Sequence, residues 1–399
     1  MSKRMAASAA NLPTVKVSAR GAARLDDGHV WVYRSDVVSA DGVSPGSPVT
    51  VTDHRGQALG IALYSSASQI AIRLISRQPV ADLPALLRQR IAAAMGYRET
   101  IIRDTDAYRV IFSEADFLPG LIVDRYHDVL SVQILTQAMD AIQIRETIIS
   151  DLADCLQPAS IVERVDPRIR ELEQLPPRDS SLLYGEKATT IFTMNGVQFH
   201  FDALAGQKTG AFLDQRENYA AAARYAGGEA LDVFCYQGGF ALHLAPRCSP
   251  ITGVDSSRPA LEIADQNAAL NQRDIQWIEA NAFDLLRDYA GSGRRYDTIV
   301  VDPPAFAKSK RELDTAMRGY KELNLRALKM LRPGGLLVTC SCSYHVSPAD
   351  FLRMLAQASR DARRGLRIVE MRGQAKDHPV LLNVPETSYL KCVIAHVSN

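Results

Sequence analysis

The second half of the chain alternates short apolar runs with helical segments, and this alternation restricts the fold more than any other feature. Five strand-like runs follow one another after residue 186: Glu229–Phe234, Ile251–Val254, Ile275–Ile278, Tyr296–Val301 and Gly335–Thr339. Apolar strands joined by helices form a parallel sheet that is covered by helices on both faces. Two later runs, Leu366–Met371 and Tyr389–His396, predict an antiparallel end. We therefore expect an α/β domain with a seven-stranded sheet over residues 186–399.

The first half of the chain predicts two smaller domains. Residues 12–78 hold short alternating runs separated by turn signals, which is typical of a small β-barrel. The four runs are Thr14–Val17, Pro48–Thr52, Ala58–Ala62 and Ile70–Ile75. Residues 79–185 predict a central α+β domain with helices over 83–103 and 138–155, and residues 171–185 predict a linker. We expect residues 1–11 to form a flexible tail.

The composition is that of an ordinary soluble globular protein. Hydrophobic residues make up 47% and charged residues 23% of the 399 residues, with 46 Lys and Arg against 45 Asp and Glu. The formal charge of +1 gives no global attraction to nucleic acid or membrane. No apolar run reaches the roughly 18 residues that span a bilayer, and the first residues lack the apolar stretch of a signal peptide. We therefore expect a cytoplasmic protein without a membrane partner.

Six cysteines are too few for a disulfide framework in a chain of this length. None of them forms a Cys-x-x-Cys pair, and no His pair has zinc-finger spacing, so we expect free thiols and no metal site.

The ends of the first two strands of the α/β domain carry residues suited to a nucleoside. Ligands in such sheets lie beyond the carboxyl ends of the strands. Gly238 and Gly239 follow the first strand and let backbone approach a ligand at the start of a helix. Asp255 ends the second strand 23 residues after Asp232, near the roughly 20-residue offset of a ribose-binding acid. The alternative is a plain turn followed by an Asp255–Ser256 helix cap.

The third and fourth strands add possible contacts to a base. The third ends at Asn281-Ala-Phe-Asp284, where Asn281 or Asp284 could accept from adenine and Phe283 could lie against its face. The third glycine of a dinucleotide fingerprint is missing, which favours a nucleoside methyl donor over NAD. The fourth strand ends in Asp302-Pro-Pro-Ala-Phe306, which resembles the substrate end of nucleic-acid methyltransferases. A Pro-Pro loop before a helix is the alternative.

The fifth strand leads into Thr339-Cys-Ser-Cys-Ser343, which brings a thiol beside Asp302. Carbon 5 of cytosine is a weak nucleophile, and addition of a thiolate at carbon 6 makes it able to take a methyl group. Such a thiol must be partly exposed. Cys340 is expected within the strand, so Cys342, which follows it, is the candidate nucleophile. Cys235 is expected in the cofactor turn. We expect Cys155, Cys248 and Cys392 to be buried packing residues.

Taken together, the chain resembles over nearly its full length the RlmI-like bacterial 23S ribosomal RNA cytosine-5 methyltransferases. The matching segments are Gly28–Tyr33, Leu118–Arg125, Gln207–Arg216, Asp232–Phe240, Asp302–Pro304 and Ser341–Ser343. The resemblance implies an N-terminal PUA domain, a small central domain and a Rossmann-like class I methyltransferase domain. The segment Arg24–Arg34 resembles the opening of a PUA domain. PUA domains of this kind bind RNA.

The resemblance also implies the roles of individual residues. The cofactor would be S-adenosylmethionine (SAM), Cys342 the covalent nucleophile and Asp302 the contact to the cytosine edge. The residues expected to hold the cofactor are Phe212, Gln215, Arg216, Asp232, Phe234, Tyr236, Gly238, Gly239, Asp255, Ser256, Asn281, Ala282, Phe283, Asp302 and Pro303. Asn281 departs from the family, in which Asp is found, although an amide can still accept from adenine. The implied partner is large-subunit ribosomal RNA, with a homodimer as a possible assembly.

Two other functions stay open at this point. Asp302-Pro-Pro-Ala-Phe306 also resembles a motif that holds an exocyclic amine, so the protein could methylate a base nitrogen without a thiol. A ribosome assembly factor that binds RNA and keeps a vestigial cofactor site is the other alternative. The basic stretch Lys308–Arg332 could hold phosphates, or it could be a solvated helix face with internal ion pairs.

Overall fold

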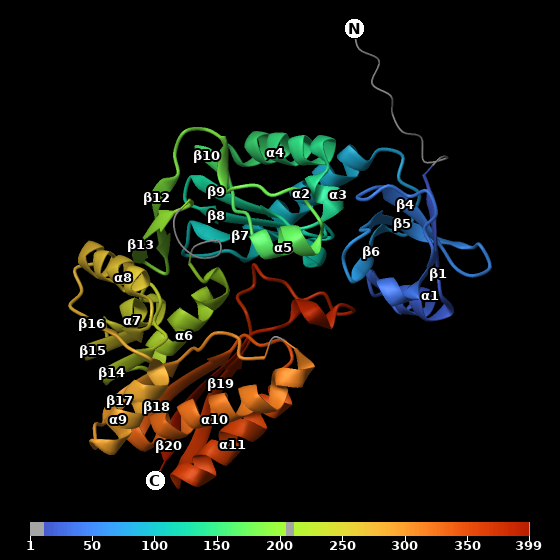
Figure 1. The fold of residues 1–399 in the computed structure, drawn as a ribbon. Helices are drawn as coiled ribbons and strands as arrows, with labels where there is room; N and C mark the ends of the chain where they lie inside the picture. The colour runs from blue at the N-terminus through green and yellow to red at the C-terminus, as the bar shows by residue number, and fades with distance from the viewer. Residues whose placement is uncertain (1–11, 205–210, 308, 399) are drawn as a thin grey trace. The chain divides into compact units, whose positions relative to one another are not determined.

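The computed structural model describes residues 12–204, 211–307 and 309–398. These residues form two compact units (Figure 1). The first contains residues 12–190, 202–204 and 377–387, and the second contains residues 191–201, 211–376 and 388–398. The expected tail at residues 1–11 lies outside the described residues.

The N-terminal part of the first unit is a six-stranded mixed sheet in the order β2-β6-β5-β4-β1-β3. Its strands are β1 (Thr14–Val17), β2 (Trp31–Tyr33), β3 (Val37–Ser39), β4 (Pro48–Thr52), β5 (Ala58–Tyr64) and β6 (Ile70–Ser76). The four predicted runs are confirmed as β1, β4, β5 and β6. Helix α1 (Ala19–Asp26) was not predicted; Ser18 caps it by accepting a hydrogen bond from the Gly21 backbone N–H. Leu25 of α1 is buried in the core of this sheet.

The central part of the first unit is a five-stranded sheet in the order β11-β10-β9-β8-β7. Its strands are β7 (Ala107–Phe112), β8 (Leu121–Tyr126), β9 (Val129–Ile134), β10 (Ser160–Glu163) and β11 (Ser181–Tyr184). Its helices are α2 (Leu83–Ile101), α3 (Gln137–Asp140), α4 (Ile142–Leu156) and α5 (Pro167–Leu172). The helix expected over 138–155 is divided at Ala141, whose ψ of 129° is not helical. The expected linker instead contributes β11, which pairs with β10.

A shared apolar core explains why the two sheets form one unit. Ile61, Leu63 and Ile75 of the first sheet are buried in one cluster with Leu87 and Ile91 of α2. The boundary expected near residue 78 therefore falls within a continuous core.

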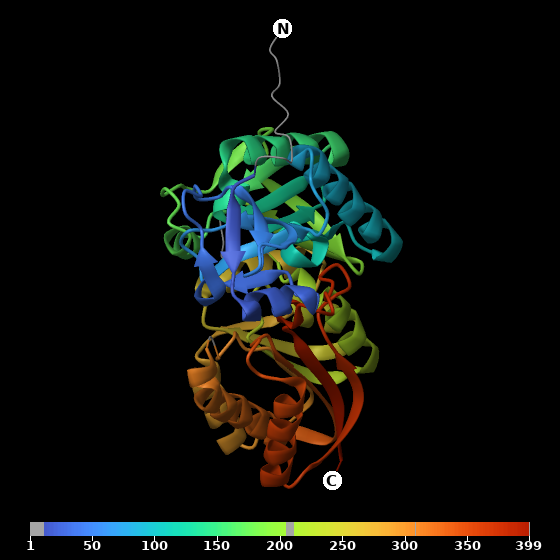
Figure 2. The same ribbon diagram turned by 90° about the vertical axis from the view of Figure 1, so that its right-hand side faces the viewer.

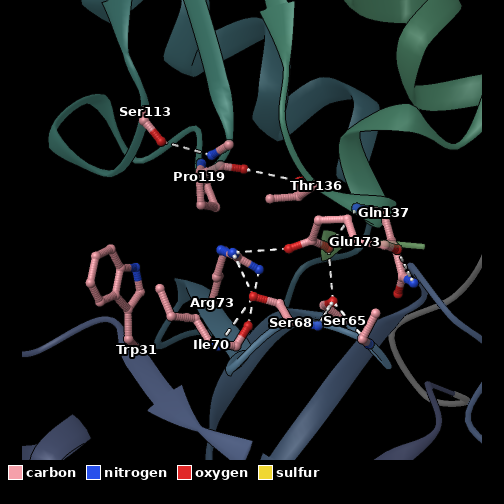
Figure 3. Close-up of polar contacts among 12 residues, drawn as sticks. Trp31, Ser65, Ser68, Ile70, Arg73, Ser113, Pro119, Thr136, Gln137 and Glu173 are labelled. Atoms are coloured by element: carbon pink, nitrogen blue, oxygen red, sulfur yellow. Dashed lines mark hydrogen bonds and ion pairs between the residues drawn. The ribbon is translucent and has the colours of Figure 1, made fainter. Parts of the chain in front are cut away.

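A buried polar network crosses between the same two sheets (Figure 3). The Glu173 carboxylate accepts hydrogen bonds from the Ser65 hydroxyl at 2.8 Å, the Gln137 backbone N–H at 3.2 Å and the Arg73 guanidinium at 3.3 Å. Arg73 also lies 3.7 Å from Glu114, which accepts from the Trp31 indole N–H at 3.0 Å. Trp31 is therefore half-buried and hydrogen-bonded.

We expect the Arg73→Met variant to unfold with a free energy lower by about 3–5 kcal/mol, because it leaves the buried Glu173 carboxylate without its cation. Urea denaturation of the full chain measures this. The matched control is Arg258→Met, which removes an exposed ion pair with Glu262 and should change the same free energy by less than about 1 kcal/mol. Equal effects of the two variants would contradict the importance of this network.

The second unit is built on a seven-stranded sheet in the order β16-β15-β14-β17-β18-β20-β19. Its strands are β14 (Gly228–Val233), β15 (Cys248–Asp255), β16 (Gln276–Glu279), β17 (Tyr296–Val301), β18 (Leu331–Ser341), β19 (Gly365–Arg372) and β20 (Lys391–Ser398). The first five are parallel, and β20 runs antiparallel to both neighbours. The predicted seven-stranded α/β sheet with an antiparallel end is confirmed. A two-stranded ribbon, β12 (Thr189–Met194) and β13 (Val197–Asp202), precedes it and was not predicted.

Helices cover this sheet on both faces (Figure 2). They are α6 (Arg216–Tyr225), α7 (Gly239–Leu244), α8 (Arg258–Leu270), α9 (Ala282–Gly291), α10 (Leu313–Met330) and α11 (Pro348–Ala362). Leu286 of α9, Leu323 of α10 and Ala358 of α11 share one buried cluster with the strands. The strand order reverses between β14 and β17, and a ligand crevice is expected beyond the carboxyl ends of strands at such a reversal.

The chain between β19 and β20 belongs partly to the first unit. Val384 is fully buried in the core of the six-stranded sheet, and Glu386 pairs with His29 at 3.2 Å. The Asp377 carbonyl accepts from the Arg98 guanidinium at 2.7 Å. A segment late in the sequence thus completes the core of the N-terminal sheet, although the sequence placed it in the last domain.

Candidate active site

The turn after β14 has an unusual backbone that is fixed by β15. Phe234, Tyr236 and Gly238 have φ values of +67°, +50° and +86°. Backbone N–H groups of Phe234 and Cys235 both donate to the Val254 carbonyl, and the Tyr236 N–H donates to Asp255 Oδ2 at 2.9 Å. Positive φ at non-glycine residues is uncommon and is often found at functional sites. The hydrogen bonds to β15 therefore hold this turn in a conformation that is uncommon for an ordinary loop.

The two glycines of the turn are required by their neighbours. A Cβ at Gly239 would lie 2.6 Å from the ring of the buried Tyr219, and one at Gly238 would lie 2.9 Å from the Trp277 ring. Tyr219 packs edge-to-face on Phe240 at 4.7 Å, so it cannot move away easily. Gly239 thus lets α7 approach α6 closely, and Gly238 lets the turn approach Trp277 of β16.

We expect Gly239→Ala to lower the melting temperature and to weaken cofactor binding about tenfold or more, because the added methyl group pushes Tyr219 or the turn out of place. Thermal unfolding and calorimetric titration with S-adenosylhomocysteine measure the two effects. Gly291→Ala is the control, since a Cβ there meets no atom within 4 Å. Unchanged binding in the Gly239 variant would exclude this turn from the cofactor site.

Asp232 is the last but one residue of β14 and is 1% exposed. One carboxylate oxygen accepts from the Ala241 backbone N–H at 2.9 Å, while the other has no hydrogen-bond partner among the described residues. Burial raises the pKa of this carboxyl to about 7, and the nearby Asp255 acts in the same direction. A buried acceptor without a donor requires an explanation, and a ligand that supplies a donor or a positive charge is one.

The Asp255 carboxylate orders its surroundings through both oxygens. Besides the bond from Tyr236, it accepts from the Ser257 N–H at 2.9 Å. Ser257, and not Ser256, is the N-cap of α8, while Ser256 is exposed. The predicted ribose-binding acid therefore lies at the end of β15 next to the turn, where it also fixes the turn.

The end of β16 is organised as a helix cap. Asn281 caps α9, and its side-chain oxygen accepts from the backbone N–H groups of Phe283 and Asp284. Asp284 is exposed and pairs with Arg287 at 2.9 Å. Ala282 is buried, and Phe283 packs against Phe306 with ring centroids 6.0 Å apart. The Asn281 oxygen is thus engaged within the helix, which leaves its amide N–H groups for a ligand.

The segment before α6 contributes the next group. The Phe212 ring lies 5.1 Å from that of Tyr236, and Gln215 donates to Asp302 Oδ2 at 2.9 Å. Arg216 is buried, and its carbonyl accepts from the Asn195 amide. Residues 207–210 of the predicted string lie outside the described residues.

Asp302 and Cys342 meet at the ends of β17 and β18. The Asp302 N–H donates to the Val233 carbonyl, which places Asp302 beside the end of β14. Cys342 follows the last residue of β18, is half-buried, and has its Sγ 3.9 Å from the carbonyl oxygen of the buried Pro303. The structure therefore brings the predicted thiol and the predicted Asp-Pro-Pro turn together at one edge of the sheet.

The other cysteines differ from Cys342 in their surroundings. Cys340 lies within β18, as predicted, and burial raises its pKa well above the usual range. Cys235, in the turn after β14, is also buried with a raised pKa. Cys248 and Cys392 are buried as expected, but the prediction for Cys155 is wrong, because it lies exposed near the end of α4. Among the described cysteines, all six are free thiols.

Three residues around Cys342 were missed by the sequence analysis. Ser343 is buried, and its hydroxyl contacts the Tyr320 hydroxyl at 3.0 Å and accepts from the Ala307 N–H at 3.2 Å. Lys391 donates to the Ser343 carbonyl at 2.6 Å. Tyr320 and Lys391 are far from Cys342 in the sequence, so no local pattern could have indicated them.

The basic stretch on α10 carries several ion pairs. Lys321 pairs with Asp361, and Arg326 with Glu322. Arg332, beyond the helix, pairs with Glu229 and Asp297. Arg326 and Glu322 form a pair within the helix, whereas Lys321 and Arg332 pair with residues outside the stretch. The contact of the stretch to phosphates stays a prediction.

The site as a whole suits a cationic nucleoside. Asp232, Asp255 and Asp302 lie at the ends of three adjacent strands, and one oxygen of Asp232 has no partner within the part of the chain that the structure describes. A positively charged ligand would lower the free energy of these neighbouring carboxylates. The residues present thus fit SAM, with its sulfonium and ammonium charges. None of the helices among the described residues could cross a membrane.

Comparisons with known proteins identify the family of this chain. Residues 15–77 match the PUA-like domain model, and residues 156–394 match the model of S-adenosylmethionine-dependent methyltransferases. The chain is 39% and 40% identical to "Ribosomal RNA large subunit methyltransferase I" of Shewanella denitrificans and Shewanella amazonensis, over 94% of this chain and 96% of each relative. The protein of that name in Yersinia pseudotuberculosis is 37% identical over 91% of this chain and 94% of its own length.

Solved structures show the same fold. A crystal structure of a proposed methyltransferase complexed with SAH superposes with a TM-score of 0.83 at 19% identity, covering 96% of this chain and 99% of that one. A proposed SAM-dependent methyltransferase from Streptococcus mutans gives a TM-score of 0.81 at 19% identity with the same coverage. With a family model over more than half of the chain and relatives matched along nearly their full length, this chain belongs to the S-adenosylmethionine-dependent methyltransferases, in the family of ribosomal RNA large subunit methyltransferase I.

Proposed function

We propose that this protein methylates carbon 5 of a cytosine in large-subunit ribosomal RNA, and that Cys342 forms a covalent bond to the base. The single observation that supports this most is the half-buried Cys342 thiol beside Pro303, at the end of the strand next to Asp302. The names of the relatives supply the substrate class. The sequence boundaries 12–78, 79–185 and 186–399 remain our proposal for the PUA-like, central and methyltransferase domains, except that residues 377–387 pack in the first unit.

The cofactor residues follow from the same geometry. We assign the turn Phe234–Gly239 with Asp232 and Asp255 to the methionine and ribose parts, and Asn281 with Ala282 and Phe283 to the base. Phe212 and Gln215 come from the segment before α6, Arg216 is the first residue of that helix, and Gln215 donates a hydrogen bond to Asp302. SAM supplies an electrophilic methyl group when it is bound. The residues named above bind and orient SAM.

The proposed reaction of the Cys342 thiol has three steps. The Cys342 thiolate forms a bond to carbon 6, and the electron pair of the 5,6 double bond moves toward carbon 5. Carbon 5 takes the methyl group as the carbon–sulfur bond of the sulfonium breaks, and SAH leaves. A base then removes the carbon 5 proton, and the electron pair of that C–H bond re-forms the double bond while the thiolate leaves. Asp302 would hold the cytosine edge.

Nucleoside mass spectrometry tests this function directly. Large-subunit RNA from cells that lack the protein is incubated with the purified protein and SAM, then digested. The expected product is 5-methylcytidine. A methyl group on a base nitrogen would instead support the amino-directed alternative. Tight binding of SAH without any methylated product would support an assembly factor.

The cytoplasmic location follows from the proposed substrate, and a homodimer would be seen by light scattering.

A further inference from the structure

A buried lysine lies next to the loop that carries Cys342. Lys391 begins β20, and in the antiparallel pairing of β18 with β20 it stands opposite Ser341. The residue is 8% exposed. Its ammonium donates to the carbonyl oxygens of Ser343 at 2.6 Å and Tyr389 at 2.7 Å. Because the two carbonyls carry no net charge, these bonds orient the ammonium without neutralising it.

Burial disfavours the protonated, charged form of Lys391. It lowers the pKa of Lys391 to about 8, whereas the charge of Cys342 acts in the opposite direction. The electrostatic interaction is mutual. A Cys342 thiolate favours the protonated form of Lys391, and protonated Lys391 in turn favours the thiolate. The charges of Lys391 and Cys342 therefore stabilise each other.

The rest of the loop is held by neutral groups. The Ser343 hydroxyl contacts Tyr320 of α10 and the Ala307 N–H, and the Cys342 thiol faces the Pro303 carbonyl. Burial raises the pKa of Tyr320, which keeps its hydroxyl neutral. Asp302, at the end of β17, carries a negative charge and disfavours a second negative charge on Cys342. Lys391 brings a positive charge to this group.

We propose that Lys391 is a positioning residue for Cys342: through the Ser343 carbonyl it fixes the loop, and its ammonium favours the thiolate. The inference rests on the proposed function, because only a thiolate nucleophile requires such a group. It assigns a role in the reaction to a residue that lies on a different strand and 49 positions away from the cysteine.

Alkylation of Cys342 by iodoacetamide tests this role without RNA or methyl transfer. The full chain carries Cys155→Ala, which removes the exposed thiol, and modification of Cys342 is quantified by peptide mass spectrometry from pH 6 to 10. We expect Lys391→Met to slow alkylation at pH 7.5 about tenfold and to move the midpoint of the pH profile upward by about one pH unit. Lys187→Met, at an exposed lysine, should leave the profile unchanged.

Two further variants keep the test decisive. Lys391→Arg keeps the charge and should retain the midpoint of the parent protein. If Lys391→Met does not fold, Lys391→Gln provides the neutral comparison. A folded neutral variant with the parent midpoint would overturn the role of Lys391, and would leave the proposed function intact. Failure of that function would show separately, as methyl transfer that persists without Cys342.

Discussion

Replacement of Cys342 by alanine will lower methyl transfer to ribosomal RNA by about 10³-fold or more, while SAH binding stays within about twofold. The thiol is the only covalent partner that the proposed reaction offers to carbon 6, so without it carbon 5 remains a weak nucleophile. Cys342 is not among the residues that we assign to the cofactor, so the substitution leaves those side chains in place. Transfer of a tritiated methyl group and calorimetry measure the two properties.

The matched control is Cys155→Ala, because this thiol is exposed on α4 in the other unit. It should transfer methyl groups at the rate of the parent protein. If the Cys342 variant still made 5-methylcytidine, the covalent step would be wrong. If it made another methylated base at an unchanged rate, the amino-directed alternative would be supported instead.

The Asp232→Asn variant will show opposite changes in stability and in cofactor affinity. In the unfolded chain this carboxyl ionises near pH 4, but in the folded protein only near pH 7. Between these values the folded state holds more protons, so the free energy of unfolding falls as the pH rises from about 4 to 7 and then levels off. The difference of about three pH units corresponds to about 4 kcal/mol, an upper limit.

The amide removes this penalty and should raise the melting temperature of the ligand-free protein at pH 8 by several degrees. The gain should shrink as the pH falls from about 7 to about 4, because below about pH 4 the parent carboxyl is protonated in both states. The ammonium group of SAH prefers an ionised carboxylate beside it, so affinity for SAH should increase as the pH rises toward 7 in the parent protein. In the variant we expect an affinity about 10–100-fold lower at pH 8 and a flatter profile.

Scanning calorimetry and titration with SAH from pH 5 to 8.5 measure these changes. Asp265→Asn, at an exposed position of α8, is the control and should alter neither property. A variant with lower stability and unchanged SAH affinity would show that Asp232 is a structural residue and does not face the cofactor.

Much of the second unit could be predicted from the sequence because its signals are local. β17 has the predicted bounds, and the other strands of the sheet differ at their ends by a few residues. Apolar runs between helices determine such a sheet, and its strand ends then bring Asp232, Asp255, Asp302 and Cys342 to one edge. The position of Cys342 just after β18 follows from the same run.

What could not be predicted depends on contacts between distant parts of the chain. Val384 looks like an ordinary loop residue in the sequence, and only its burial under the N-terminal sheet shows its role. Glu173 lies in a proline-rich stretch typical of a linker, but its carboxylate is buried with Arg73. Lys391 is part of a strand pattern, and its link to Cys342 arises from strand pairing, which the sequence alone does not fix.

The most direct test of the account uses RNA in which 5-fluorocytosine replaces cytosine. After methyl transfer carbon 5 then carries fluorine instead of a proton, so no base can restore the double bond and the thiol stays attached. With SAM present, we predict a stable protein–RNA adduct whose digested peptide carries the nucleotide on Cys342. An adduct on another residue, or methylation of normal RNA without any adduct on the fluorinated RNA, would contradict the account.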